Sequence, residues 1–258
     1  MYTNLEFNIS MKHLEMLISS TDENLLLLGG WAVHMLVNER FKKDNGRVYL
    51  GSRDIDLGFS LSKGPERASF MRVYRHLTER MGFRPLSFRL FKEIHLETGE
   101  MLDGEKAKSI PLFNIFQMYV DMIVDTVPKW FKDRYHFIPI NEPMVKSIFE
   151  DKENHIVTQA FGKQIWLPAT KILVGMKIKS FPDREKEHKR SKDLADLVTL
   201  VLYSKDANLD GLEEIVGLKS IRRFRKTFQH EDAVQASILT GLDTSVIEGA
   251  ISRISENK

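Results

Sequence analysis

Two aspartates, Asp54 and Asp56, stand one residue apart in the largely apolar run GSRDIDLGF at Gly51–Phe59. Side chains alternate along a β-strand, so a strand here directs both carboxylates to one face. Hard divalent cations prefer carboxylate oxygens, and two such ions stabilise the attacking and leaving oxygens of phosphoryl or nucleotidyl transfer. The pattern predicts a metal-dependent site, with one alternative, a salt bridge from these acids to Arg53 or Arg47.

A third acid is predicted on a later strand. The stretch Asn114–Asp125 alternates so that Asp121 and Asp125 share one face, opposite a row of apolar residues. Asp121 has apolar neighbours on both sides and is the favoured third acid. Asp125 stands at the expected end of the strand, where solvated acids are common, and the sequence leaves both candidates open.

A glycine pair, Gly29-Gly30, follows the apolar run Leu25–Leu28 and precedes a predicted helix over 31–41. Such a pair lets the backbone approach a phosphate, whose oxygens then meet the N–H groups of the helix N-terminus. The alternative is a glycine pair that only makes a tight turn. Asp54 follows Gly30 by 24 positions, which predicts a loop or a helix extension at KKDNGR.

The predicted fold class is α+β, with a mixed sheet and flanking helices over 1–167 and a helical domain over 168–258. Strands are predicted over 25–28, 48–61, 85–101 (as two strands) and 114–125, with a hairpin over 155–167. Helices in this part are predicted near 14–18, 31–41 and 65–81. After Pro168 the patterns are helical, with an apolar stripe over 194–202 and further helices near 209–216, 220–228, 231–239 and 244–254.

The amino-acid composition of the chain excludes several classes of site and of protein. The chain has no cysteine, which excludes disulfides, thiolate zinc sites and a cysteine nucleophile. It has no apolar stretch of 18 residues and its N-terminus lacks a signal pattern, so we expect a cytoplasmic protein without a membrane span. The net charge is only +2, but KSIRRFRK at Lys219–Lys226 holds five basic residues and no acid. Such a segment attracts phosphates or RNA, or forms a solvated helix face.

Taken together, these motifs resemble the DNA polymerase β-type nucleotidyltransferase superfamily. The resemblance rests on GGWA after the first strand, on SRDID at Ser52–Asp56 and on an acid in a later strand. The run Pro168–Leu202 contains Lys177 and then Lys192-Asp193-x-x-Asp196, and it is similar to the abortive-infection (AbiEii-like) toxin group of that superfamily.

The resemblance implies a nucleotidyltransferase core followed by a helical domain, and a site for two Mg²⁺ ions held by Asp54, Asp56 and Asp121. Asp121 would also accept the proton of the attacking hydroxyl. The residues that the resemblance assigns to nucleotide binding are Gly29, Gly30, Ser52, Lys177, Lys192, Asp193 and Asp196. Asp193 and Asp196, one helical turn apart, equally suit the polar edge of a packed helix.

The implied reaction is the transfer of a nucleoside monophosphate from an NTP to a hydroxyl acceptor, for which RNA, including tRNA, is the favoured candidate. A cognate antitoxin would be a partner. The alternative is a non-catalytic nucleotide- or partner-binding module with the same fold. A metal-dependent phosphohydrolase fits less well, because the sequence offers no cluster of histidine and aspartate ligands.

Overall fold

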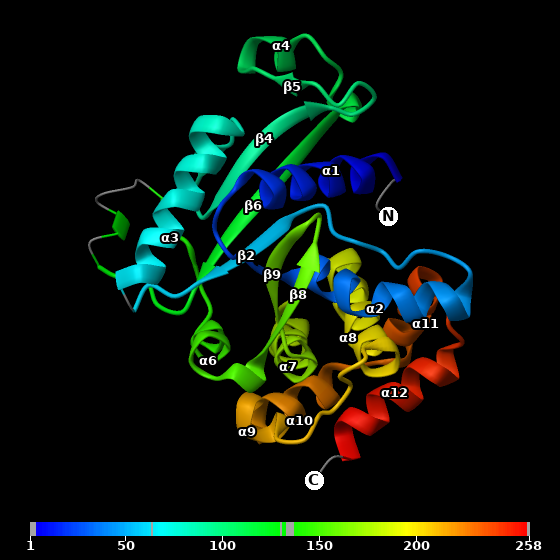
Figure 1. The fold of residues 1–258 in the computed structure, drawn as a ribbon. Coiled ribbons are helices and arrows are strands. Elements are labelled where there is room, and N and C mark those ends of the chain that lie inside the picture. Colours follow the sequence, from blue (N-terminus) through cyan, green and yellow to red (C-terminus); the bar gives the residue numbers. More distant parts are fainter. Residues whose placement is uncertain (1–3, 63, 130, 133–136, 257–258) are drawn as a thin grey trace. The chain divides into compact units, whose positions relative to one another are not determined.

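The structure of the protein is a computed structural model that describes residues 4–62, 64–129, 131–132 and 137–256 (Figure 1). The chain forms two compact units. The first comprises Met1–Trp31 and Gly51–Leu167, and the second comprises Ala32–Leu50 and Pro168–Lys258. The second unit, called the helical unit below, therefore also contains Ala32–Leu50, which the sequence prediction placed in the first domain.

The first unit is a mixed β-sheet with flanking helices, which confirms the predicted fold class. The strand order is β3-β4-β6-β2-β1-β9-β8, with β5 paired to β4 and β7 paired to β6. β6 runs parallel to β2 and antiparallel to β4, whereas β1 runs antiparallel to β2. The strands are β1 (Leu26–Leu28), β2 (Ile55–Phe59), β3 (Arg84–Leu86), β4 (Arg89–His95), β5 (Met101–Leu102), β6 (Ile115–Val124), β7 (Ile140–Asn141), β8 (His155–Ala160) and β9 (Lys163–Pro168).

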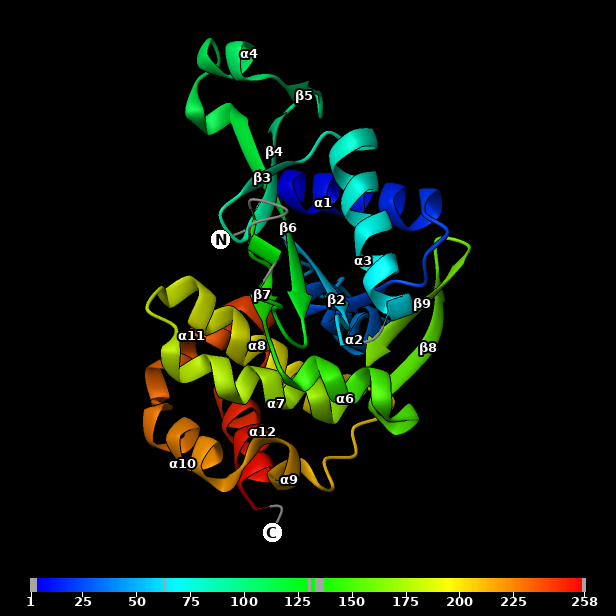
Figure 2. The ribbon, with the colours of Figure 1, turned by 90° about the vertical axis from the view of Figure 1, so that its left-hand side faces the viewer.

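Two helices of this unit, α1 and α3, lie on the same side of the sheet (Figures 1 and 2). They are linked where Ser20 Oγ lies 2.8 Å from His76 Nε2, in the π-helical turn His76–Arg80 that continues α3. The helices described in this unit are α1 (Asn4–Ser20), α3 (Gly64–Arg75), α4 (Gly104–Lys108) and α6 (Met144–Glu150). The apolar residues that stand at helical spacing in α3 and the turn after it are buried, namely Phe70, Val73, Leu77 and Met81.

The two faces of the sheet differ in polarity. The even-numbered residues of β6 are buried and apolar: Phe116, Met118, Val120, Met122 and Val124. They lie on the face that α1 and α3 cover, where the ring centroids of Phe59 on β2 and Phe70 on α3 are 5.1 Å apart. The opposite face carries the odd-numbered residues of β6, including Asp121, and is more exposed along most of the strand. The alternation predicted for this strand is thus confirmed.

The helical unit is built around α8, whose segment Ser191–Val201 is entirely buried. α8 contacts α7, α11 and α12. The helices are α2 (Gly29–Asn45), which begins in the first unit, α7 (Thr170–Ser180), α8 (Glu187–Tyr203), α9 (Leu212–Val216), α10 (Leu218–Thr227), α11 (His230–Thr240) and α12 (Thr244–Glu256). None of the described helices has both the length and the apolar character that a membrane span requires.

Two predicted boundaries change near the acids. β2 begins at Ile55, so Asp54 precedes the strand instead of lying within it. α2 extends to Asn45, so most of the KKDNGR segment is a helix extension.

Candidate active site

Three neighbouring strands and the residue that follows β1 bring an arginine, two acids and a glycine into one row across the sheet. Asp56 on β2 pairs in register with Leu28, the last residue of β1, and with Asp121 on β6. β4 runs antiparallel to β6 in a register that places Arg89, its first residue, opposite Asp121. The row from the end of β1 to β4 is therefore Gly29, Asp56, Asp121 and Arg89, and the three charged residues share the face opposite α1 and α3.

Gly29 is the residue that lets the chain pass over Asp56. Its φ is +58°, a conformation that favours glycine, and a Cβ at this position would lie 1.8 Å from Asp56 Oδ2. A Cβ on Gly30 would lie 3.0 Å from the Cβ of Ser52 and 3.2 Å from its Oγ. The structure thus brings the predicted residues Gly29, Gly30 and Ser52 together beside Asp56, where α2 begins.

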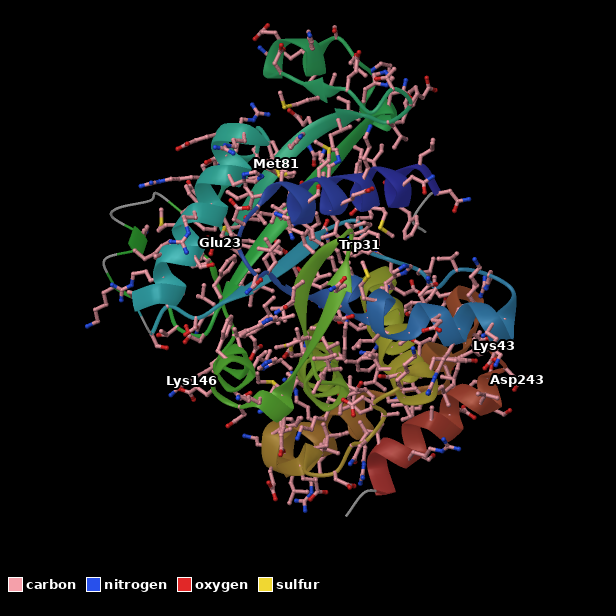
Figure 3. All side chains as sticks on the ribbon, in the orientation of Figure 1. Glu23, Trp31, Lys43, Met81, Lys146 and Asp243 are labelled. Carbon is pink, nitrogen blue, oxygen red and sulfur yellow. The ribbon has the colours of Figure 1, made fainter. Side chains whose placement is uncertain are left out.

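The first turn of α2 is held in place by Trp31, which is fully buried. The indole of Trp31, which is labelled in Figure 3, donates a hydrogen bond from Nε1 to Ser10 Oγ on α1 at 3.1 Å, and its ring lies 5.4 Å from that of Phe7. The loop before β2 is tied to α1 as well, because Arg53 Nη2 lies 3.0 Å from Glu6 Oε1. These contacts fix the N-terminus of α2 and the approach to Asp54.

Arg89 forms a bidentate ion pair with Asp121. Its Nε donates to Asp121 Oδ1 at 2.9 Å and its Nη2 donates to Asp121 Oδ2 at 2.6 Å. Nη2 also lies 3.5 Å from Asp54 Oδ2, and the guanidinium lies 4.2 Å from the ring centroid of Tyr119. Burial favours the neutral form, but Asp121, with Asp54 and Asp56, outweighs it and raises the pKa of Arg89.

The sequence suggested a basic partner for the acids but missed Arg89. Arg47 Nη2 donates to the carbonyl oxygen of Leu239 in the helical unit at 3.3 Å. The contact between Arg89 and Asp121 spans 32 residues and depends on the register of β4 against β6. The available sequence signal was the alternating pattern of β4, which begins at this arginine.

Asp125, the competing third acid, has structural contacts. Its Oδ2 accepts hydrogen bonds from Ser60 Oγ at 2.8 Å and Ser62 Oγ at 2.9 Å, and its Oδ1 accepts one from the Leu61 N–H at 2.8 Å. These donors follow β2 directly, so Asp125 joins the ends of β2 and β6. Asp121 instead lies beside Asp56 in the charged row.

The acidic cluster, Asp54, Asp56 and Asp121, has the donor chemistry of a magnesium site, since all its ligand atoms are carboxylate oxygens. A cation already lies between two of its members, because the Arg89 guanidinium contacts both Asp121 and Asp54. In this arrangement no group of three or more His, Cys, Asp or Glu side chains among the described residues is placed to hold a metal ion. The acidic cluster supplies the donor atoms that a cation needs, and in this structure its cationic partner is Arg89.

The other four residues predicted to bind nucleotide form a buried network within the helical unit. Lys177 Nζ donates to Asp193 Oδ1 at 2.6 Å and to Asp196 Oδ2 at 2.7 Å. Lys192 Nζ donates to Asp196 Oδ1, which also accepts a hydrogen bond from Tyr49 Oη at 2.7 Å. The helical-unit network is therefore Tyr49, Lys177, Lys192, Asp193 and Asp196. The sequence did not single out Tyr49.

Charge pairing favours the ionised forms of Asp193 and Lys177. Burial disfavours the charged form of Asp193, but Lys177 and Arg184 outweigh it and lower the pKa of Asp193 to about 2. Burial likewise opposes the charge on Lys177, but Asp193 and Asp196 outweigh it and raise the pKa of this lysine. For Lys192 burial prevails, and its pKa is lowered. These contacts fit the packed polar helix edge, and nucleotide binding by these residues stays a prediction.

No protein-family model matches the chain, and no curated protein matches it.

Among solved structures, the chain is similar to one described as an antigenic nucleotidyltransferase-like protein from Paracoccidioides brasiliensis. The two chains are 12% identical, the match covers 86% of this chain and 92% of the other, and the TM-score is 0.42. Likeness at this level is too low to assign an activity, and membership of the AbiEii-like group stays a prediction.

Proposed function

We propose that the protein is a magnesium-dependent nucleotidyltransferase that transfers a nucleoside monophosphate from an NTP to a hydroxyl acceptor. One observation carries this proposal: the row across β1, β2, β6 and β4, in which Gly29 packs against Asp56 and Asp56 pairs with Asp121. Two carboxylates on adjacent parallel strands beside a helix N-terminus suit a metal-bound triphosphate.

The acidic cluster, the start of α2 and Ser52 have defined tasks in this proposal. Asp54, Asp56 and Asp121 hold Mg²⁺, which when bound neutralises charge on the phosphates and on the attacking and leaving oxygens. The N–H groups that open α2 and the Ser52 hydroxyl donate to phosphate oxygens. The oxygen of the acceptor hydroxyl bonds to the α-phosphorus, and an Asp121 carboxylate oxygen accepts the proton that this hydroxyl loses. The bond from that phosphorus to the oxygen it shares with the β-phosphorus breaks, and pyrophosphate leaves.

The proposal is tested by incubating the protein with Mg²⁺, total cellular RNA and each α-labelled NTP in turn. The wild-type chain is expected to transfer label from one or more nucleotides into RNA, and Asp56→Ala is expected to transfer none. Circular dichroism of both proteins controls for folding. If neither protein transfers label to RNA although both bind NTP equally, a non-catalytic binding module or a non-RNA acceptor is the better description.

RNA is the acceptor class that we propose, and helix α10 supports it. Its apolar residues Ile221 and Phe224 are buried. Arg223 Nη1 donates to Asp183 Oδ2 at 3.0 Å. The remaining basic side chains of the helix are exposed, and they are Lys219, Arg222, Arg225 and Lys226. An exposed basic face without an acid attracts a phosphate backbone without reading its sequence.

Replacing Arg222 and Arg225 together by alanine is expected to weaken RNA binding and to make it less dependent on salt. Each lost phosphate contact reduces the slope of log affinity against log salt by about 1. Fluorescence anisotropy with labelled RNA at several salt concentrations measures both effects. Lys42→Ala with Lys43→Ala is the matched control, because these two exposed lysines lie on another helix of the same unit. Equal losses in both double variants would contradict a specific role for α10.

An AbiEii-like toxin role and a cognate antitoxin remain predictions from the sequence resemblance. A direct test is to express the wild-type chain and Asp56→Ala in growing cells. Growth arrest that requires Asp56 would support the toxin role.

A further inference from the structure

Arg89 occupies the position in which the acidic cluster is expected to meet its metal. Its two donor atoms bind both oxygens of Asp121, and the same Nη2 reaches Asp54 on a different segment of the chain. The side chain of Asp121 is 10% exposed and that of Arg89 is 18% exposed, so water screens this pair only partly. A bidentate pair of this kind is among the stronger hydrogen-bonded contacts.

A guanidinium and a divalent cation compete for the same carboxylate oxygens. Both need the lone pairs of Asp121, and the positive charges of the two repel each other at short range. A metal that binds Asp121 through either oxygen must therefore displace at least one of the hydrogen bonds from Arg89. The apparent affinity for the metal is reduced by the free energy of the contact that is lost.

Arg89 can leave Asp121 without disturbing the ladder of β4. It is the first residue of β4 and follows the turn at Ser87-Phe88, which connects β3 to β4. Its guanidinium lies near the rings of Tyr119 and Phe88, at 4.2 Å and 5.5 Å from their centroids. Aromatic faces stabilise a guanidinium at several positions along its path.

We propose that Arg89 closes the acidic cluster in the absence of substrate. It holds Asp121 and Asp54 as an internal counter-ion, releases them when a metal–nucleoside triphosphate binds, and then pairs with the triphosphate. Arginine suits the second task because its planar fork binds phosphate oxygens in a bidentate manner. This inference rests on the proposed function and identifies a residue that the sequence resemblance did not include.

The test measures metal binding without turnover. Mn²⁺ is titrated into wild type, Arg89→Gln and Arg84→Gln by isothermal titration calorimetry, with free Mn²⁺ followed by electron paramagnetic resonance. Arg84 is the matched control, because its Nη2 lies 2.9 Å from Glu93 Oε2 and its guanidinium lies 4.8 Å from the Phe91 ring centroid. Loss of the Arg89 contact is expected to tighten Mn²⁺ binding about tenfold, the equivalent of about 1.4 kcal/mol, and Arg84→Gln is expected to bind like wild type.

A second titration tests the triphosphate contact. The α,β-methylene analogue of ATP, which cannot transfer its nucleotide, is titrated with saturating Mg²⁺ present. Arg89→Gln is expected to bind it about tenfold more weakly than wild type. If Arg89→Gln does not fold, Arg89→Lys replaces it, because lysine keeps the charge and loses the bidentate fork. Smaller shifts in the same two directions are then expected.

The outcomes separate this inference from the proposed function. Equal Mn²⁺ binding by wild type and Arg89→Gln would overturn the counter-ion role and leave the metal site intact. Tighter Mn²⁺ binding with unchanged binding of the analogue would overturn the triphosphate contact. If neither wild type nor Arg89→Gln binds Mn²⁺, the metal site of the proposed function fails and this inference fails with it.

Discussion

Replacing Asp121 by asparagine is expected to reduce nucleotidyl transfer by a factor on the order of 10²–10³ or more, whereas replacing Asp125 by asparagine should leave most of it. The change at Asp121 keeps the shape of the side chain but removes a negative charge from the acidic cluster. Removing one preorganised electrostatic contact from a reaction centre commonly costs this much in rate. Asp125 lies outside the charged row, and its carboxylate oxygens accept hydrogen bonds from the segment after β2.

For Asp125→Asn the main effect is expected in stability. In Asp125→Asn the new side chain would retain one acceptor oxygen for the Leu61 N–H, but its amide group would face hydroxyls that now donate to the carboxylate. The expected cost is about 1–3 kcal/mol of unfolding free energy. Transfer of label to RNA measures activity, and urea unfolding followed by circular dichroism measures stability. If Asp125→Asn loses transfer while Asp121→Asn keeps it, the third acid has been assigned to the wrong residue.

The sequence predicted this part of the site because it depends on alternation and apolar runs. Asp56 and Asp121 each stand in a strand flanked by apolar residues, and both predicted strands are present. The hairpin over 155–167 was also predicted, and β8 and β9 are joined by Phe161-Gly162, which has positive φ at both residues. Positive φ at both residues is typical of a two-residue hairpin turn.

What the sequence missed depends on pairing between distant segments. The alternation of β4 indicates only which face of the sheet Arg89 is on. A two-residue shift of β4 against β6 would keep that face and move Arg89 away from Asp121, and no local pattern in the sequence excludes it. Tyr49 was missed for the same reason, because its partner Asp196 is 147 residues away. Its position in the helical unit also follows from Ala32–Leu50 joining that unit, which no composition change near residue 32 indicates.

The contacts of the helical-unit network indicate a role in stability, whereas the sequence resemblance assigned four of its residues to nucleotide binding. The resemblance assigned Lys177 to nucleotide binding, but its ammonium group donates hydrogen bonds to two carboxylates in this structure. A lysine in that state has little free capacity for a further anion unless a carboxylate releases it. The contacts therefore give these residues a direct role in stability, whatever their role toward nucleotide.

Replacing Asp196 by asparagine is expected to destabilise the protein by about 3–5 kcal/mol, because removing one partner of a buried ion pair leaves uncompensated charge. Asp196 is fully buried and accepts hydrogen bonds from Lys177, Lys192 and Tyr49. Tyr49→Phe removes a single hydrogen bond to the same carboxylate, so a smaller loss of about 1.5–3 kcal/mol is expected. Urea unfolding at pH 7, followed by circular dichroism, compares the variants.

Restoring the charge balance should recover part of the stability that Asp196→Asn loses. In Asp196→Asn with Lys192→Met, both the lost carboxylate and one of its lysines are neutral, so less charge remains unpaired than in the single variant. A double variant as unstable as Asp196→Asn would show that packing, not charge, sets the cost.

The pH of the comparison matters because the pKa of Asp193 is lowered in the folded protein. The contribution of Asp193 to stability is complete above about pH 4, its pKa in the unfolded chain, and is lost as the pH falls through about 2. At pH 7 Asp193 is ionised in every variant, so the differences report Asp196 and its donors.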